Sequence, residues 1–110
     1  MAARFTLIIE TDSGGKRSFP ISAPWTTVGR SGLDDVQLDT PAVERRHFRI
    51  RWKGTDLILV DSGSPGRCLV NDVDVPRNGE VPLEPGDRIH VGTTILTVHM
   101  ATQDSEADDA

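Results

Sequence analysis

A chain of 110 residues, of which 36% are hydrophobic, is long enough for one folded domain and short for two. Its net charge of −5 and the absence of a long basic stretch argue against nucleic-acid binding, and no apolar run reaches membrane-spanning length. The single cysteine, Cys68, excludes an intrachain disulfide and favours a reducing compartment. Because the N-terminus lacks the form of a signal peptide, we expect a cytoplasmic domain without membrane contact.

Short alternating or apolar runs follow one another between turn residues, and no long stretch keeps the 3.6-residue apolar period of a helix. The clearest run is 47–53, where Phe48, Ile50 and Trp52 share one side. We expect Trp25 and Trp52 in the core or at its edge. Short, evenly spaced strands predict an all-β sandwich. The expected strands span 4–11, 16–22, 26–30, 35–38, 47–53, 55–61, 67–71, 73–76, 80–83, 87–91 and 93–100.

The last ten residues differ from the rest of the chain in composition. They carry four carboxylates, and removing these would change the net charge from −5 to −1. We therefore predict a sandwich domain over 1–100 and a disordered acidic tail over 101–110. The four acidic residues are Asp104, Glu106, Asp108 and Asp109.

The sequence contains no catalytic or metal-binding constellation. His47, His90 and His99 lack metal-ligand spacing, and Cys68 has no nearby base that would activate it as a nucleophile. Glycine motifs that cradle nucleotides are also absent. We expect no enzyme, no metal and no cofactor. Binding in a sandwich usually resides in the end loops, and the candidate loops are 29–35, 39–47 and 61–68.

Three stretches in series resemble the forkhead-associated (FHA) domain. They are TVGRSGLDDVQLDTPAVERRHFRI at 27–50, LILVDSGSPGRCLVNDVDV at 57–75 and LEPGDRIHVGTTILTV at 83–98, and the resemblance extends over about residues 5 to 99. It implies an FHA-like sandwich of about eleven mostly antiparallel strands. It also implies a recognition module that binds phosphothreonine peptides through loops at one end and performs no catalysis.

Part of the family's binding site is retained. Gly29-Arg30 matches the family's Gly-Arg pair, whose arginine binds the phosphate through a bidentate, charge-assisted contact. Arg45 follows the position of the family's phosphate-binding serine and can still face a phosphate. The resemblance implies an architectural role for His47, which ties loops together, and a hairpin role for Asn71.

Three contact positions depart from the family. Glu44 stands where the serine hydroxyl should donate to the phosphate, and Pro65 and Gly66 replace the threonine and asparagine that hold the peptide. The candidate phosphopeptide-binding residues are Arg30, Ser31, Arg45, Ser64 and Arg67.

These departures predict an FHA-type protein-interaction module whose phosphothreonine binding is weak or lost, with Glu44 paired to Arg30 or Arg45. The alternative is a phosphothreonine-dependent signalling adaptor that uses Arg30 and Arg45. A less favoured alternative is an assembly domain that self-associates through sheet faces or edges.

Overall fold

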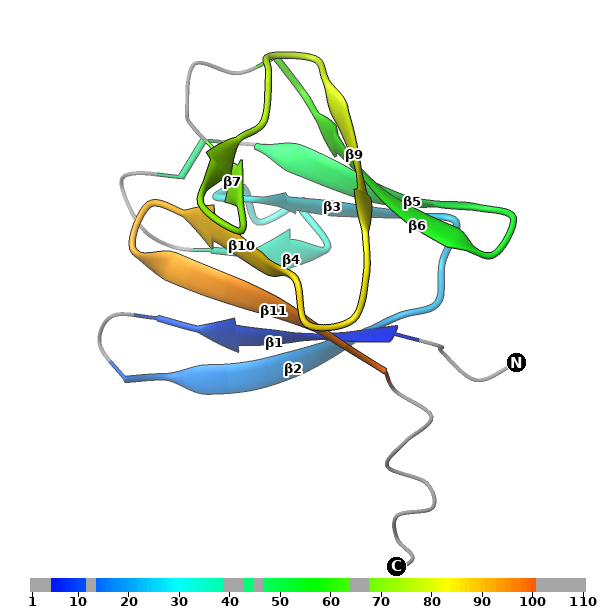
Figure 1. Cartoon of the computed structure of the whole chain (residues 1–110). Coiled ribbons are helices and arrows are strands. Elements are labelled where there is room, and N and C mark those ends of the chain that lie inside the picture. The colour runs from blue at the N-terminus through cyan, green and yellow to red at the C-terminus, as the bar shows by residue number, and fades with distance from the viewer. Residues whose placement is uncertain (1–4, 12–13, 39–42, 45–46, 64–67, 101–110) are drawn as a thin grey trace, which may run out of the picture.

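The computed structural model describes residues 5–11, 14–38, 43–44, 47–63 and 68–100. Within these residues the regular structure consists of eleven strands in two sheets, with the order β2-β1-β11-β10-β7-β8 in one sheet and β4-β3-β5-β6-β9 in the other (Figure 1). The strands are β1 (Phe5–Glu10), β2 (Lys16–Ile21), β3 (Trp25–Gly29), β4 (Val36–Gln37), β5 (Phe48–Lys53), β6 (Asp56–Asp61), β7 (Leu69–Val70), β8 (Val73–Asp74), β9 (Glu80–Leu83), β10 (Arg88–Val91) and β11 (Thr94–Met100).

Nearly all strand pairs are antiparallel, as the resemblance implied. Among the described pairs only β3 and β4 run parallel, with Val28 opposite Val36. The all-β sandwich with about eleven mostly antiparallel strands is therefore confirmed. No helix in the described residues has the length and apolar character needed to cross a membrane.

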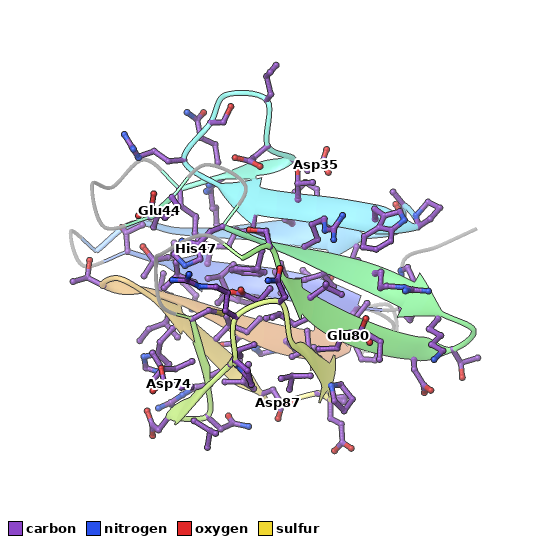
Figure 2. The ribbon with its side chains drawn as sticks, turned by 90° about the horizontal axis from the view of Figure 1, so that it is seen from above. Asp35, Glu44, His47, Asp74, Glu80 and Asp87 are labelled. Atoms are coloured by element: carbon purple, nitrogen blue, oxygen red, sulfur yellow. The ribbon has the colours of Figure 1, made fainter. Side chains whose placement is uncertain are left out.

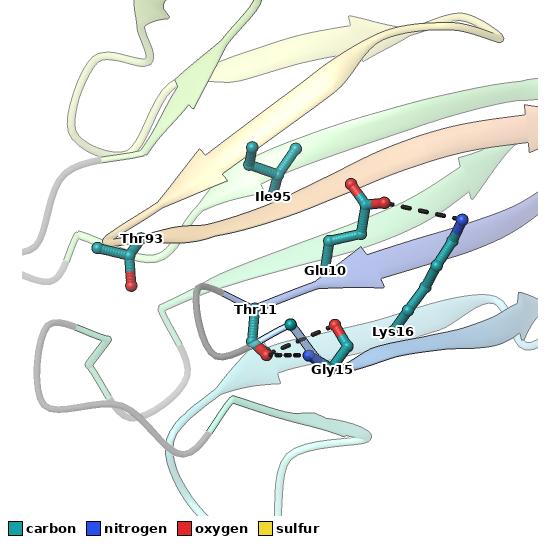
Figure 3. Close-up of a pocket in the computed structure, with 7 residues that line it drawn as sticks. Glu10, Thr11, Gly15, Lys16, Thr93 and Ile95 are labelled. Carbon is teal, nitrogen blue, oxygen red and sulfur yellow. Dashed lines mark hydrogen bonds and ion pairs between the residues drawn. The ribbon is translucent and has the colours of Figure 1, made fainter.

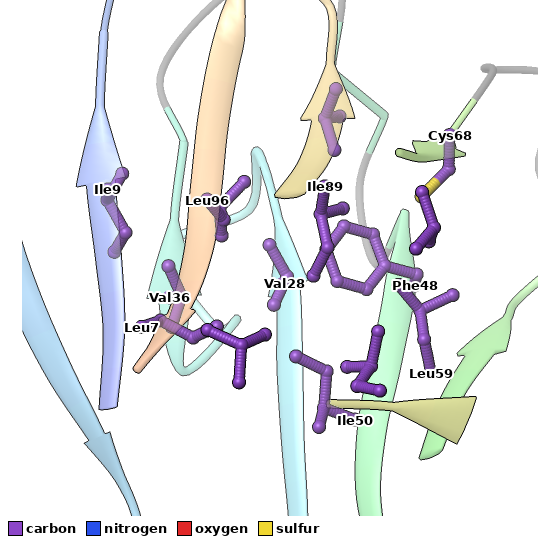
Figure 4. Packing of buried hydrophobic residues seen from close by; sticks show 14 of the residues in the cluster. Leu7, Ile9, Val28, Val36, Phe48, Ile50, Leu59, Cys68, Ile89 and Leu96 are labelled. Carbon is purple, nitrogen blue, oxygen red and sulfur yellow. The ribbon is translucent and has the colours of Figure 1, made fainter. Parts of the chain in front are cut away.

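The core lies between the two sheets and follows the alternation of the strands. Leu7 and Ile9 of β1 belong to the same buried cluster as Phe48 and Ile50 of β5, and the side chains of all four are fully buried (Figure 4). This layer of branched and aromatic side chains provides the main favourable free energy of folding, because burial of each large side chain contributes roughly 1.5–3 kcal/mol.

The two tryptophans differ in their environment. Trp52 packs against the core and stacks on Phe5, with ring centroids 5.4 Å apart, as expected for a core-edge residue. The expectation for Trp25 was wrong, since its side chain is 42% exposed on the outer face of β3. The alternation of β3 explains the difference, because Thr26 and Val28 occupy the inward positions.

Two residues with positive φ build the hairpin between β7 and β8. Asn71 (φ 52°) and Asp72 (φ 70°) form its two-residue turn. The Asn71 amide donates to Asp87 Oδ1 (2.9 Å) and its Oδ1 accepts from the backbone N–H of Arg88 (3.0 Å). Asn71 thus ties the hairpin to the start of β10.

Candidate functional site

Strand register brings three chain segments together at one end of the sandwich. Val28 of β3 lies opposite Phe48 of β5, and Phe48 lies opposite Asp61 of β6. The segments that leave β3, enter β5 and leave β6 are therefore neighbours. Glu44 and His47 lie together here, away from Asp74 and Asp87 of the other sheet (Figure 2).

Arg30 follows β3 and is bound to the segment that precedes β5. Its backbone N–H donates to the carbonyl of Glu44 (3.0 Å), and its Nε donates to the carbonyl of Val43 (2.8 Å). The side chain is exposed, and within the described residues its terminal Nη atoms donate no hydrogen bond. The guanidinium is thus anchored at Nε and presents two donor groups to solvent.

The loop after Arg30 is closed by short-range hydrogen bonds. The backbone N–H of Ser31 donates to Asp34 Oδ2 (3.0 Å), and its hydroxyl accepts from the backbone N–H of Leu33 (3.0 Å). Gln37 Nε2 donates to the carbonyl of Arg30 (3.2 Å). Ser31 therefore has a structural function in this turn, and its hydroxyl donates to no residue that the structure describes.

His47 is fully buried beneath the loops. Its Nδ1 accepts the backbone N–H of Glu44 (3.0 Å), so in this arrangement the ring carries its proton on Nε2. The hydroxyl of Ser62 donates to the carbonyl of His47 (2.8 Å). His47 thus connects the loop before β5 with the loop after β6.

Sequence reasoning did not point to Asp61, whose carboxylate accepts hydrogen bonds from backbone groups in two segments that follow β6. Its carboxylate is 4% exposed, and Oδ2 accepts the backbone N–H groups of Gly63 and Asn78, both at 2.9 Å. Gly63 has φ +85°, and a Cβ there would lie 2.6 Å from the Asn78 side chain, so only glycine fits. The signal was present as Asp-Ser-Gly, a sequence typical of a side-chain turn.

Cys68 lies near Asp61 and is buried. Burial, and secondly the negative charge of Asp61, raise the pKa of the thiol from 9.0 to about 12. Since the thiolate is the nucleophilic form, the structure gives Cys68 an inert environment.

The remaining predicted site residues have different outcomes. Arg45, Ser64, Pro65, Gly66 and Arg67 lie outside the described residues. Arg30 and Glu44 are joined through the backbone, but their side chains form no ion pair, so that half of the predicted pairing is absent.

One further pocket shares no residue with this site. It has a volume of about 330 Å³ and lies between the β1–β2 hairpin and the turn from β10 to β11 (Figure 3). Lys16 in its wall is paired with Glu10 (3.8 Å), and the described lining contains no arginine or histidine. Among the described residues, no group of three or more His, Cys, Asp or Glu is placed to hold a metal ion.

The family model of the FHA domain matches residues 26–92. The chain belongs to the FHA domain family. Its relatives include the FHA domain-containing protein FhaA of Mycobacterium tuberculosis, 29% identical over 90% of this chain and 18% of FhaA. The glycogen accumulation regulator GarA of Mycolicibacterium smegmatis is 30% identical over 78% of this chain and 52% of GarA.

Solved FHA structures have the same architecture. The FhaA FHA domain, solved in complex with the intracellular domain of Rv3910, superposes with a TM-score of 0.76 and 30% identity, over 86% of this chain and 99% of that domain. This FHA domain spans only about a fifth to a half of the two curated relatives. FHA domains are protein-interaction modules that recognise phosphothreonine, and Arg30, Glu44 and His47 occupy the loop end of this one.

Proposed function

We propose that this FHA domain is a non-catalytic protein-interaction module whose phosphothreonine binding is weak or lost. One observation carries the proposal. The backbone bond between Arg30 and Glu44, with the Nε contact to Val43, holds a carboxylate-bearing residue beside the arginine that would bind phosphate. A phosphate that approached Arg30 would also approach Glu44.

The energetic cost at Glu44 has two parts. Loss of a hydroxyl that donates to a charged phosphate forfeits roughly 1.5–3 kcal/mol. Repulsion between two unit charges ~4 Å apart adds about 1 kcal/mol in water and about 4 kcal/mol at an effective dielectric near 20. Because a phosphothreonine carries about −1.5 to −2 charges, the repulsion exceeds that of a single pair. Each 1.4 kcal/mol weakens binding about tenfold, so the two costs together would weaken a micromolar interaction by about two orders of magnitude or more.

The alternative is a phosphothreonine-dependent adaptor, and the exposed guanidinium of Arg30 favours it. Its Nη atoms have no partner among the described residues and are ready to donate to an anion. The two candidate functions share the fold and differ in whether the attraction of Arg30 exceeds the repulsion of Glu44.

Calorimetry with one threonine peptide library, measured phosphorylated and unphosphorylated, separates the two functions. We expect any phosphate-dependent binding to be about two orders of magnitude weaker than micromolar, or weaker still. Tight binding that requires the phosphate would overturn the proposal and establish the adaptor. The double variant Glu44→Ser with Gly66→Asn should gain phosphopeptide affinity. The control is the same Glu-to-Ser change at Glu84, far from the site (Glu84→Ser), which should not change the affinity.

The proposed partner is a protein, in keeping with the relatives that are regulators. A cytoplasmic location and the absence of catalysis belong to the same proposal. Assembly through sheet faces is the less favoured candidate, and light scattering that detects only monomers would remove it.

A further inference from the structure

The outer face of the β3–β5–β6–β9 sheet carries a second basic surface, remote from Arg30 along β3. Register places Trp25, Arg51, Ile58 and Pro82 in one row across the four strands. Thr27, Arg49, Val60 and Glu80 form the next row. The guanidinium carbons of Arg49 and Arg51 lie 4.7 and 5.2 Å from the ring centre of Trp25. We call Trp25, Arg49 and Arg51 the stacked surface.

The two arginines of the stacked surface lack carboxylate partners. Neither forms an ion pair with a described residue, and Arg49 Nε is shielded from solvent without a hydrogen-bond acceptor. Three carboxylates lie on the same face, and one of them, Asp56, stands opposite Lys53 in the β5–β6 pair. Asp35 accepts the backbone N–H of Thr27 (2.9 Å), and Glu80 stands two strands from Arg49. The surface therefore presents two uncompensated cations, one of them partly desolvated.

Such a surface attracts an anionic group more strongly than a fully solvated arginine side chain would. Stacking on Trp25 fixes both guanidinium groups, so binding requires less ordering of side chains. Partial burial lowers the local dielectric, and this strengthens attraction to an incoming carboxylate. The exposed indole ring adds apolar area beside the charges.

An anionic segment of this same chain starts close by. β11 ends at Met100, which lies opposite Phe5 in the strand register. The ring of Phe5 stacks on Trp52, and Trp52 is the residue next to Arg51 in β5. Figure 1 shows β11 ending on the side of the molecule where β3 begins. The four carboxylates of 101–110 follow Met100 by four to nine residues, a reach of roughly 13–32 Å, whereas packed sheets lie about 10 Å apart.

We propose that the acidic segment 101–110 docks on the stacked surface of its own chain through its carboxylates. The stacked surface is distinct from the loops around Arg30, so this inference goes beyond the proposed function. Tethering supplies an effective concentration on the order of millimolar, which lets a contact too weak for a free peptide be substantially occupied.

Paramagnetic broadening in NMR spectra tests the proposal on the full chain. A spin label attached at Ser105→Cys reports where the segment spends its time, and Cys68 is too buried to react. We expect the amide signals of 25–27 and 49–51 to lose roughly half of their intensity or more, given occupancy at millimolar effective concentration. At 1 M salt, where the screening length is about 3 Å, the signals should recover.

Two test variants, a control variant and a mixing experiment between differently labelled molecules separate the possible outcomes. Arg49→Gln with Arg51→Gln should restore these signals at least twofold, whereas the matched pair Arg77→Gln with Arg88→Gln should not. If the arginine pair disturbs folding, neutralising the segment itself (Asp104→Asn, Glu106→Gln, Asp108→Asn, Asp109→Asn) should give the same recovery. Broadening that is unchanged by both variants would overturn the proposal. Broadening that appears only when labelled and isotope-enriched molecules are mixed would also overturn it, in favour of a second copy as occupant.

Discussion

The loop end of this FHA domain contains an inner layer, formed by His47 and Asp61, and an outer layer, formed by Arg30 and Glu44. The two layers differ in how their polar side chains are hydrogen-bonded. In the inner layer, His47 and Asp61 are buried and accept backbone N–H groups at 2.9–3.0 Å. In the outer layer, within the described part of the chain, the Arg30 side chain is held by its Nε alone and Glu44 forms hydrogen bonds through its backbone alone. The inner layer therefore stabilises the fold, whereas changes to the outer side chains should affect stability less.

The largest expected effect is in the inner layer at Asp61. Asp61→Ala leaves the backbone N–H groups of Gly63 and Asn78 without their acceptor, at roughly 1–3 kcal/mol for each group. We expect a loss of about 2–5 kcal/mol in the free energy of unfolding, measured by urea denaturation with tryptophan fluorescence. Asp61→Asn keeps an acceptor oxygen and should lose less. Equal losses for the two variants would contradict the hydrogen-bond explanation.

A smaller loss is expected at His47. His47→Ala removes the acceptor for Glu44 N–H and opens a cavity, so unfolding should become easier by about 2–4 kcal/mol. The same denaturation experiment applies. His90→Ala is a matched control, because that histidine is only partly buried on β10, and a loss as large there would contradict the specific role of His47.

Glu44→Gln tests the outer layer and separates charge from shape. Because the described contacts of Glu44 are made by its backbone, the free energy of unfolding should change by less than about 0.5 kcal/mol. Removing the carboxylate charge should strengthen phosphopeptide binding about tenfold, the equivalent of 1.4 kcal/mol, in calorimetry. A large destabilisation would show that the side chain belongs to the inner layer after all.

The smallest effect concerns Cys68, whose pKa is raised from 9.0 to about 12 by burial and by Asp61. The unfolded chain ionises this thiol first as the pH rises, so its contribution to stability is present below pH 9 and is lost between pH 9 and about 12. At neutral pH, a thiol reagent should react with native protein much more slowly than with unfolded protein. Asp61→Asn should lower this pKa, and fast labelling of native protein would contradict the burial.

The sequence predicted the strands well, but it predicted the burial and the hydrogen-bond partners of individual side chains less well. Alternation in 47–53 put Phe48 and Ile50 on one side of a strand, and in the structure both side chains are fully buried. The same rule could not place Trp25, because a strand has two faces and the pattern does not say which one a second sheet covers. Asp61 was missed because its partners, Gly63 and Asn78, are brought to it by a turn and by the path of the β8–β9 connection.

By itself, the sequence determined the fold class and the family, because these depend on local periodicity and on motif residues. It also contains an acid, Glu44, where the resemblance implies a phosphate-binding serine. Tertiary structure alone decided that Arg30 is anchored to the backbone beside Glu44 and that Arg49 and Arg51 share Trp25. Both arrangements arise from the register between β3 and β5, which pairs residues 20 to 26 positions apart. Such pairing is fixed by the packing of the whole sandwich, because a slip of one residue would turn every side chain of the strand to the opposite face.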